Sequence, residues 1–160
     1  MTEELELKLV GKYPKILRDF RGDPKVTCMA FGIETDDGWY NLLDKCMEKL
    51  QYFCDLCSKD GREVQVIADQ IKEKFGGLRF YISVYGANEI ENKIVDDIIL
   101  EAERNATNIC EATGESGNLC SRGGWYKTLC RTEARKFGYV ACNEELEKYW
   151  KTKDEKDGNP

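Results

Sequence analysis

The chain has 160 residues and a mass of 18.4 kDa, enough for one domain with an apolar core and too little for two independent domains. Hydrophobic residues make up 41% of the sequence and charged residues 34%, which excludes a disordered chain. There is no histidine, which excludes histidine-dependent triads and imidazole-ligated metal sites. The net charge of -6 argues against direct binding of nucleic acid by the surface as a whole, because such binding needs a positive footprint.

No apolar run approaches the roughly 18 residues that a membrane span requires, and the first residues lack the basic start and apolar stretch of a secretion signal. We therefore expect a cytoplasmic protein with no membrane partner. Charge is unevenly distributed: Gly86 to Ser116 carries eight acidic residues against two basic ones, whereas Gly117 to Tyr139 carries five basic residues against one acidic residue. This pattern fits a solvated surface, or an interaction protein with a polarised charge.

The first predicted elements are a short helix that ends near Lys12 and a turn at 21–24. The clearest helix follows Asp36 and Asp37, whose side chains could accept the free N–H groups of a first turn. We expect this helix to end at 59–61. Apolar residues recur in it at spacings of three and four and predict one buried stripe of Trp39, Leu43, Cys46, Leu50, Phe53 and Cys57.

The segment 62–85 contains two apolar runs separated by Gly76-Gly77. A Gly-Gly pair suits a two-residue hairpin turn, because both central positions can adopt a positive φ. The hairpin would place Phe75 opposite Leu78 and Ile71 on the same face as Ile82. A basic strip of Lys72, Lys74, Arg79 and Tyr81 would then occupy the opposite face. A helix through Val64, Ile67, Ile71 and Phe75 is the competing interpretation, and we favour the hairpin because the second run is clearly β-like and needs a partner strand.

A second long helix is predicted over 88–108, with Ile90, Ile94, Ile98 and Ala102 on its buried face. The region 110–142 is rich in cysteine and glycine and is expected to be a loop-rich knuckle. A final short helix over 143–151 is expected to precede a charged flexible tail, 152–160. The predicted fold is therefore a single α+β domain over 1–151, with two amphipathic helices packed on a small antiparallel sheet.

The sequence contains eight cysteines, and a chain without an export signal favours thiols or metal thiolates over disulfides. Cys54 and Cys57 have the spacing of half a zinc site or of a redox pair, but they lie within the apolar stripe and are interpreted as small hydrophobic residues. A second group, Cys110, Cys120, Cys130 and Cys142, could hold zinc through four thiolates.

The usual pairing of zinc ligands is broken in this second group. Thr113 and Glu133 stand where second thiols would be expected, three residues after Cys110 and Cys130. Free buried thiols, a zinc site and a disulfide all remain open, and zinc is the one cofactor that the residues suggest.

Four motifs resemble a family of small uncharacterised proteins of bacteriophages and prophages. They are Gly38-Trp-Tyr40 with Leu42-Leu43, the segment Ile71-Lys-Glu-Lys-Phe-Gly-Gly-Leu-Arg-Phe-Tyr81, Cys110-Glu-Ala-Thr-Gly114, and Gly124-Trp-Tyr-Lys-Thr-Leu-Cys130. In that family the last two motifs often form paired-cysteine zinc knuckles. The resemblance implies a viral origin, and by analogy with small acidic phage proteins, anti-CRISPR proteins among them, it implies binding of a host or defence protein in the bacterial cytoplasm.

No convincing catalytic constellation is found in the sequence, so the leading hypothesis is a phage-encoded accessory protein that binds and inhibits a bacterial defence effector stoichiometrically. The partner would be a host or defence protein, or a nucleoprotein complex. The candidate contact residues are the basic strip Lys72, Lys74, Arg79 and Tyr81, and the acidic residues Glu91, Asp96, Asp97, Glu101 and Glu103.

Two alternatives are a metal-dependent nuclease and a structural zinc module that mediates an interaction. Asp69, Glu73 and Lys72 are the only grouping that suggests the nuclease, since two carboxylates and a lysine can hold Mg²⁺ and position water. On the hairpin model, however, Lys72 points away from both carboxylates, because successive side chains alternate between the two faces of a strand.

Overall fold

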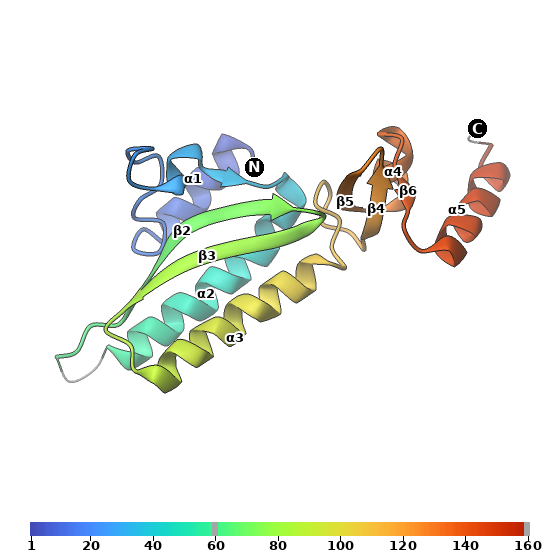
Figure 1. The fold of residues 1–160 in the computed structure, drawn as a ribbon. Coiled ribbons are helices and arrows are strands. Elements are labelled where there is room, and N and C mark those ends of the chain that lie inside the picture. Colours follow the sequence, from blue (N-terminus) through green and yellow to red (C-terminus); the bar gives the residue numbers. More distant parts are fainter. Residues whose placement is uncertain (59–60, 159–160) are drawn as a thin grey trace.

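The computed structural model describes residues 1–58 and 61–158 and combines helices with two small sheets (Figure 1). The N-terminal region, residues 1–109, contains α1 (Glu3–Lys12), η1 (Cys28–Phe31), β1 (Ile33–Glu34), η2 (Asp37–Trp39), α2 (Tyr40–Cys57), β2 (Gln65–Lys74), β3 (Gly77–Tyr85) and α3 (Glu89–Ala106). The C-terminal region, residues 110–158, contains β4 (Asn118–Arg122), β5 (Trp125–Leu129), α4 (Arg131–Lys136), β6 (Val140–Ala141) and α5 (Glu144–Lys156). The predicted α+β class is confirmed.

Strands β2 and β3 form an antiparallel hairpin, so the prediction of a hairpin is confirmed and the helical alternative is wrong. The turn lies one residue earlier than predicted, because Lys74 pairs with Gly77. Phe75 and Gly76 are therefore the central residues, with φ angles of 53° and 79°. Two positive φ angles match the twist of the flanking strands. Leu78 pairs with Glu73, so the predicted pairing of Phe75 with Leu78 is wrong.

The first sheet has the order β1-β2-β3 and is mixed, not purely antiparallel as predicted. The short strand β1 lies parallel to β2, with Ile33 opposite Ile71. A parallel pair needs a crossover connection, and α2 supplies it. The helix thus lies against the sheet because the chain crosses from β1 to β2 through it.

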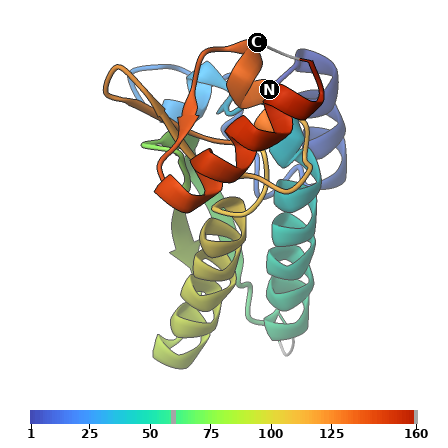
Figure 2. The ribbon, with the colours of Figure 1, turned by 90° about the vertical axis from the view of Figure 1, so that its right-hand side faces the viewer.

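Helices α1, α2 and α3 lie to one side of the hairpin, where their apolar residues form the main core (Figure 2). The predicted stripe of α2 is buried at Leu43, Cys46 and Leu50 and only partly buried at Phe53 and Cys57. Among the described contacts, the predicted capping by Asp36 and Asp37 is absent: Asp36 binds Lys127 instead, and Asp37 accepts a hydrogen bond from the Thr2 N–H. α2 ends at Cys57, and residues 59 and 60 of its predicted end lie outside the described residues.

The predicted inner face of α3 is correct at Ala102 and in part at Ile98, which packs against the core, but it is wrong at Ile90 and Ile94. Ile90 and Ile94 are 73% and 39% exposed. The inner face consists of Val95, Ile99, Ala102 and Ala106. Both stripes have helical spacing, and in the observed rotation Glu91 also contacts Arg62. The small alanines then face α2 and β3, which both pack against α3.

The C-terminal region is more regular than the predicted loop-rich knuckle. Strands β4 and β5 form a hairpin around Gly123-Gly124, and β6 pairs with the other edge of β4. Helix α5 continues to Lys156, so the predicted end at Lys151 is too early. Arg131 and Arg135 extend the helix, because they bind Asp154 and Asp157 in its last turns. Residues 159–160 of the predicted tail lie outside the described residues.

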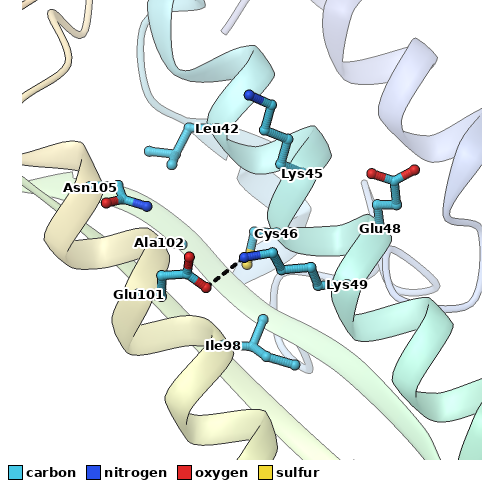
Figure 3. Close-up of a pocket in the computed structure, with 9 residues that line it drawn as sticks. All are labelled: Leu42, Lys45, Cys46, Glu48, Lys49, Ile98, Glu101, Ala102 and Asn105. Carbon is cyan, nitrogen blue, oxygen red and sulfur yellow. Dashed lines mark hydrogen bonds and ion pairs between the residues drawn. The ribbon is translucent and has the colours of Figure 1, made fainter.

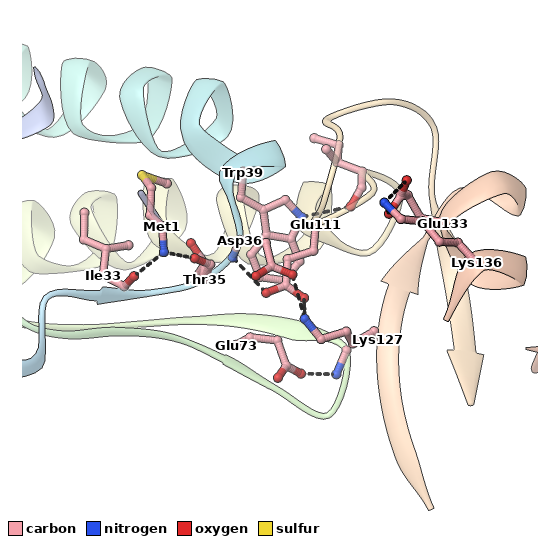
Figure 4. A network of polar contacts seen from close by, with 12 residues as sticks. Met1, Ile33, Thr35, Asp36, Trp39, Glu73, Glu111, Lys127, Glu133 and Lys136 are labelled. Atoms are coloured by element: carbon pink, nitrogen blue, oxygen red, sulfur yellow. Dashed lines mark hydrogen bonds and ion pairs between the residues drawn. The ribbon is translucent and has the colours of Figure 1, made fainter. Parts of the chain in front are cut away.

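A set of polar contacts joins the two regions (Figure 4). The Gly38 N–H donates to the Glu111 carbonyl at 2.7 Å, and beside it the Trp39 indole N–H donates to the carbonyl of Ile109, the last residue of the N-terminal region, at 2.8 Å. The Glu111 carboxylate accepts hydrogen bonds from the Asp36 N–H at 3.0 Å and from Lys127 Nζ at 3.1 Å. We call the side chains of Asp36, Glu111 and Lys127 the junction cluster. It joins β5 and the segment before β4 to the segment that follows β1.

Candidate partner-binding surface

The structure brings the predicted basic strip together on one face of the first sheet. Lys72 and Arg79 are directly opposite each other, and Gln70 and Tyr81 are the next pair. Lys74 lies two residues after Lys72 and therefore on the same face. The opposite face carries Ile71 and Phe80, which are buried against the helices. We call Lys72, Lys74, Arg79 and Tyr81 the hairpin face. Within the described chain no helix covers it, as the turned view shows (Figure 2).

A bulge in β2 sets which residues reach this face. The pairing shifts between Ala68 and Gln70, so that Asp69 has no partner in the ladder. One extra residue inverts the alternation of faces. Ala68 and Ile71 are therefore both buried although they are three residues apart. The Asp69 carboxylate accepts a hydrogen bond from the Ser83 hydroxyl at 2.9 Å.

The cations of the hairpin face are not neutralised within the protein. Among the described residues no carboxylate lies within 4.0 Å of Lys72, Lys74 or Arg79, whereas many other basic side chains are paired, such as Lys49 with Glu101. The Arg79 guanidinium donates to the Leu78 carbonyl at 2.7 Å, and Lys74 Nζ lies 5.6 Å from the centroid of the Phe75 ring. Unpaired cations on an uncovered sheet face leave positive charge available to a partner.

Three of the five predicted acidic contact residues form contacts within the protein. Glu91 forms a capping box with Asn88 and binds Arg62 at 2.6 Å. The hydrogen bond from Arg62 lowers the pKa of Glu91, and the Asn88 N–H contributes to the same shift. Such charge-assisted bonds stabilise the ionised carboxylate.

Of the other four acidic residues, two contact other elements of the fold and two are exposed to solvent. Glu101 binds Lys49 of α2 at 2.6 Å. Glu103 accepts the backbone N–H of Phe80 at 3.1 Å and so occupies a donor on the free edge of β3. Asp96 and Asp97 are exposed on α3 and form no ion pair with the described residues. Of the five, only Asp96 and Asp97 form no ion pair or hydrogen bond with the described residues, although the Glu101 side chain is also 53% exposed.

The nuclease grouping is not assembled. Glu73 Oε1 accepts the N–H of Gly76 at 2.5 Å, and Lys72 lies on the other face of the strand. The described residues contain no group of three or more cysteine, aspartate, glutamate or histidine side chains that could hold a metal ion. The two carboxylates of the grouping are used in the hairpin itself.

Among the described residues, the four thiols of the proposed zinc site likewise do not form a group that could hold a metal ion. None of the eight cysteines forms a disulfide bond. Cys110, Cys120 and Cys130 are buried in the second core, whereas Cys142 is exposed. Burial raises the pKa of Cys120 to about 11. Thr113 lies in the loop beside Cys130, with its hydroxyl 4.0 Å from Cys130 Sγ. Three of the thiols thus serve as small core residues, and a zinc centre gains no support.

A groove between α2 and α3 is a second candidate surface (Figure 3). Its volume is about 480 Å³ and its apolar lining consists of Leu42, Cys46, Ile98 and Ala102. The ion pair between Lys49 and Glu101 spans it, which keeps the two helices joined at this point. Burial raises the pKa of Cys46 to about 12, so its thiol stays protonated at neutral pH. The groove therefore offers no reactive group.

A third surface was missed by the sequence analysis. Phe75, at the tip of the β2–β3 hairpin, and Trp125 and Tyr126, after the Gly123-Gly124 turn, line one pocket. The second Gly-Gly pair could have revealed it, because it has the same hairpin signal as the first. The cysteine and glycine content of the region instead predicted a loop-rich knuckle.

Comparison with known proteins adds no assignment: no family model, curated protein or solved structure matches the chain. The resemblance to phage proteins therefore stays a prediction that rests on the four motifs. Among the helices of the described chain, none combines the length and apolar composition needed to cross a membrane.

Proposed function

We propose that the protein is a stoichiometric binding protein that inhibits a bacterial defence effector, and that the hairpin face is its main contact surface. The proposal includes the viral origin implied by the resemblance and a place of action in the bacterial cytoplasm. Its partner is a protein of the host or of its defence system, alone or within a nucleoprotein complex.

One observation carries this proposal: no helix of the described chain covers one face of the first sheet, and this face presents three cations without acidic partners among residues 1–58 and 61–158. A sheet that is packed on only one side ordinarily alternates between apolar residues inward and mixed polar residues outward. Here the outward residues Lys72, Arg79 and Tyr81 instead concentrate one sign of charge beside an aromatic ring. Arginine and tyrosine are the side chains enriched at energetically dominant positions of interfaces. In a protein of net charge -6 this local positive surface would favour an acidic patch on the partner.

The exposed carboxylates of α3 support a second, weaker contact. Asp96 and Asp97 lie on its solvent side near Leu100, which is also exposed. Because they are not paired with described cations, they could meet a basic surface of the same partner. The proposal places most of the binding energy on the hairpin face, since it combines charge with aromatic area.

The decisive experiment titrates the protein into a purified candidate effector and follows the activity of the effector. We expect inhibition to saturate near one protein molecule per effector. The double variant Lys72→Glu with Arg79→Glu should weaken inhibition by about tenfold or more, because two attractive charges become repulsive. The partner itself is found by comparing proteins captured from the native host by the wild type and by this variant.

Lys148→Glu is the matched control, since Lys148 is an exposed cation on α5, far along the chain from the hairpin face, and pairs only with Glu145. It should inhibit as the wild type does. Inhibition that persists at strongly substoichiometric ratios would show turnover and would contradict a binding protein. Equal inhibition by the double variant would remove the hairpin face from the interface.

A further inference from the structure

Two tight turns meet between the two regions and enclose a pocket of about 390 Å³. The turn of the β2–β3 hairpin contributes Glu73, Lys74 and Phe75, and the turn of the β4–β5 hairpin contributes Gly124, Trp125 and Tyr126. The hydrogen bond from the Thr128 hydroxyl to the Gly76 carbonyl, 2.6 Å long, holds the two hairpins together beside it. One buried hydrogen bond thus links the two walls.

The aromatic side chains of this pocket are not part of either core. Phe75 is 71% exposed, Trp125 74% and Tyr126 41%. The other two tryptophans, Trp39 and Trp150, are buried. Three large rings that meet at one place in solvent form an apolar surface that typically marks an interaction site.

The backbone at Phe75 strengthens this conclusion. Its φ of 53° lies in the left-handed region, which is unfavourable for a bulky side chain. Asparagine or glycine is the favoured residue at this position of such a turn. Because the ring is exposed, packing within the protein does not offset the cost. Strain of this kind concentrates at functional sites.

The charge around the pocket selects the kind of ligand. Lys74 stands at its rim, and Lys72 and Arg79 continue along the adjacent hairpin face, all without acidic partners among the described residues. Glu73 is the only carboxylate in the lining, and it is hydrogen-bonded to the Gly76 N–H. Exposed rings next to a line of cations can stack unpaired bases and bind phosphates at the same time.

We propose that this pocket, with the adjacent cations, binds single-stranded nucleic acid, with bases stacked on Phe75 and Trp125 and the phosphates along Lys74, Lys72 and Arg79. The net charge of the whole chain, which argued against nucleic acid, does not describe this local surface. Binding of oligonucleotides can be measured without an effector, so this proposal can be tested separately from the proposed inhibition.

The test measures binding of a fluorescein-labelled strand of about 15 deoxythymidines by anisotropy, together with quenching of tryptophan fluorescence. Trp125 is the one exposed tryptophan of the three, so stacking should quench it selectively. Trp125→Ala and Phe75→Asn should each weaken binding about tenfold. Phe75→Asn keeps the hairpin intact, because asparagine followed by glycine is the preferred pair for this turn. Three phosphate contacts predict a slope of about -2 for log K against log salt.

Tyr149→Ala is the matched control: Tyr149 is an exposed ring on α5 with Lys153 Nζ 5.5 Å from its centroid, much as Lys74 lies over Phe75. It should bind the strand as the wild type does. Absence of binding at low salt, equal affinity for duplex DNA, or unchanged affinity of Trp125→Ala would each overturn the proposal. Loss of effector inhibition in Phe75→Asn without any oligonucleotide binding would assign the pocket to a protein partner instead.

Discussion

The two regions of the protein are stabilised in different ways. The core of the N-terminal region is built from leucine, isoleucine, valine and methionine on three helices and a sheet. The core of the C-terminal region contains three cysteines and two alanines, and its larger members are Leu129, Tyr139 and Trp150. Burial of apolar area stabilises by about 25 cal/mol per Å². The second core has less such area to bury, so more of its stability must come from polar contacts.

Those polar contacts lie between α4 and α5. Arg135 binds Asp154 at 2.7 Å and Glu147 at 3.0 Å, and its guanidinium lies 5.5 Å from the Trp150 ring centroid. Arg131 binds Asp154 and Asp157. Several ion pairs in the N-terminal region, such as Lys8 with Glu4, are exposed pairs of little energetic weight. The comparison predicts that substitutions act through lost burial in the first region and through charge in the second.

The largest expected effect is that of Trp39→Ala. Trp39 is fully buried in the main core, and its indole N–H is bonded to Ile109 at the boundary of the two regions. The change should lower the free energy of unfolding by about 3–5 kcal/mol, because it removes a large enclosed side chain. Urea denaturation followed by circular dichroism measures it. Trp125→Ala, at an exposed position, should change stability by less than about 0.5 kcal/mol.

The next effect concerns the junction cluster. Lys127→Met leaves the Glu111 carboxylate buried without its cation and should cost about 2–3 kcal/mol at pH 7, below the range for fully buried pairs, because the Lys127 side chain is 31% exposed. Denaturation midpoints at several pH values measure this cost. Lys136→Met, which breaks an exposed pair with Glu133, should cost less than about 1 kcal/mol.

The cost of Lys127→Met should also depend on pH. Burial raises the pKa of Glu111 above its usual value, and this outweighs the opposing effect of Lys127. A carboxyl with a raised pKa in the folded state favours folding while it is protonated, and this contribution is lost as pH rises from the unfolded pKa through the folded one. Without Lys127 the pKa rises further, so the variant should lose more stability at pH 7 than near pH 4. Adding Glu111→Gln to Lys127→Met should restore stability at pH 7, because it removes the unpaired buried charge. A cost of Lys127→Met that does not vary with pH, or a double variant that is no more stable, would contradict the role of the junction cluster.

Gly38→Ala tests how closely the regions approach each other. A Cβ at Gly38 would collide with backbone atoms of Cys110, Glu111 and Gly114. We expect a loss of about 1–3 kcal/mol, since backbone atoms cannot move aside as a side chain can. Thermal unfolding measures it. Gly11→Ala is the control: nothing lies within 4 Å of its Cβ, and inside α1 it should stabilise by about 0.5–1 kcal/mol.

The smallest expected effect is the loss of the N-cap of α5, which should be confined to the C-terminal region. Asn143 accepts the N–H of Leu146 and so caps α5, and Asn143→Ala should cost about 1 kcal/mol. Hydrogen exchange should show lower protection of α5 and unchanged protection of β2 and β3, because the cap supports only the second core. Equal loss of protection in both regions would show that they unfold as one unit.

Much of the fold could be predicted from the sequence, and the errors have definite causes. The periodicity of α2 and the Gly-Gly signal of the hairpin are local, so both could be inferred. The inner face of α3 could not be inferred in full, because two apolar stripes compete and the choice depends on how the helix packs against α2 and β3. The hairpin face of the candidate site followed from strand alternation alone. The pocket of Phe75 and Trp125 did not, because its halves lie about fifty residues apart in the sequence.

The sequence by itself determined the α+β class, the hairpin, and the grouping of the hairpin-face cations, because each depends on residues close to one another along the chain. Only the tertiary structure decided which thiols are core residues, which carboxylates are already bound, and which rings remain in solvent. Those properties depend on neighbours that packing brings in from other elements, and a local pattern does not encode them.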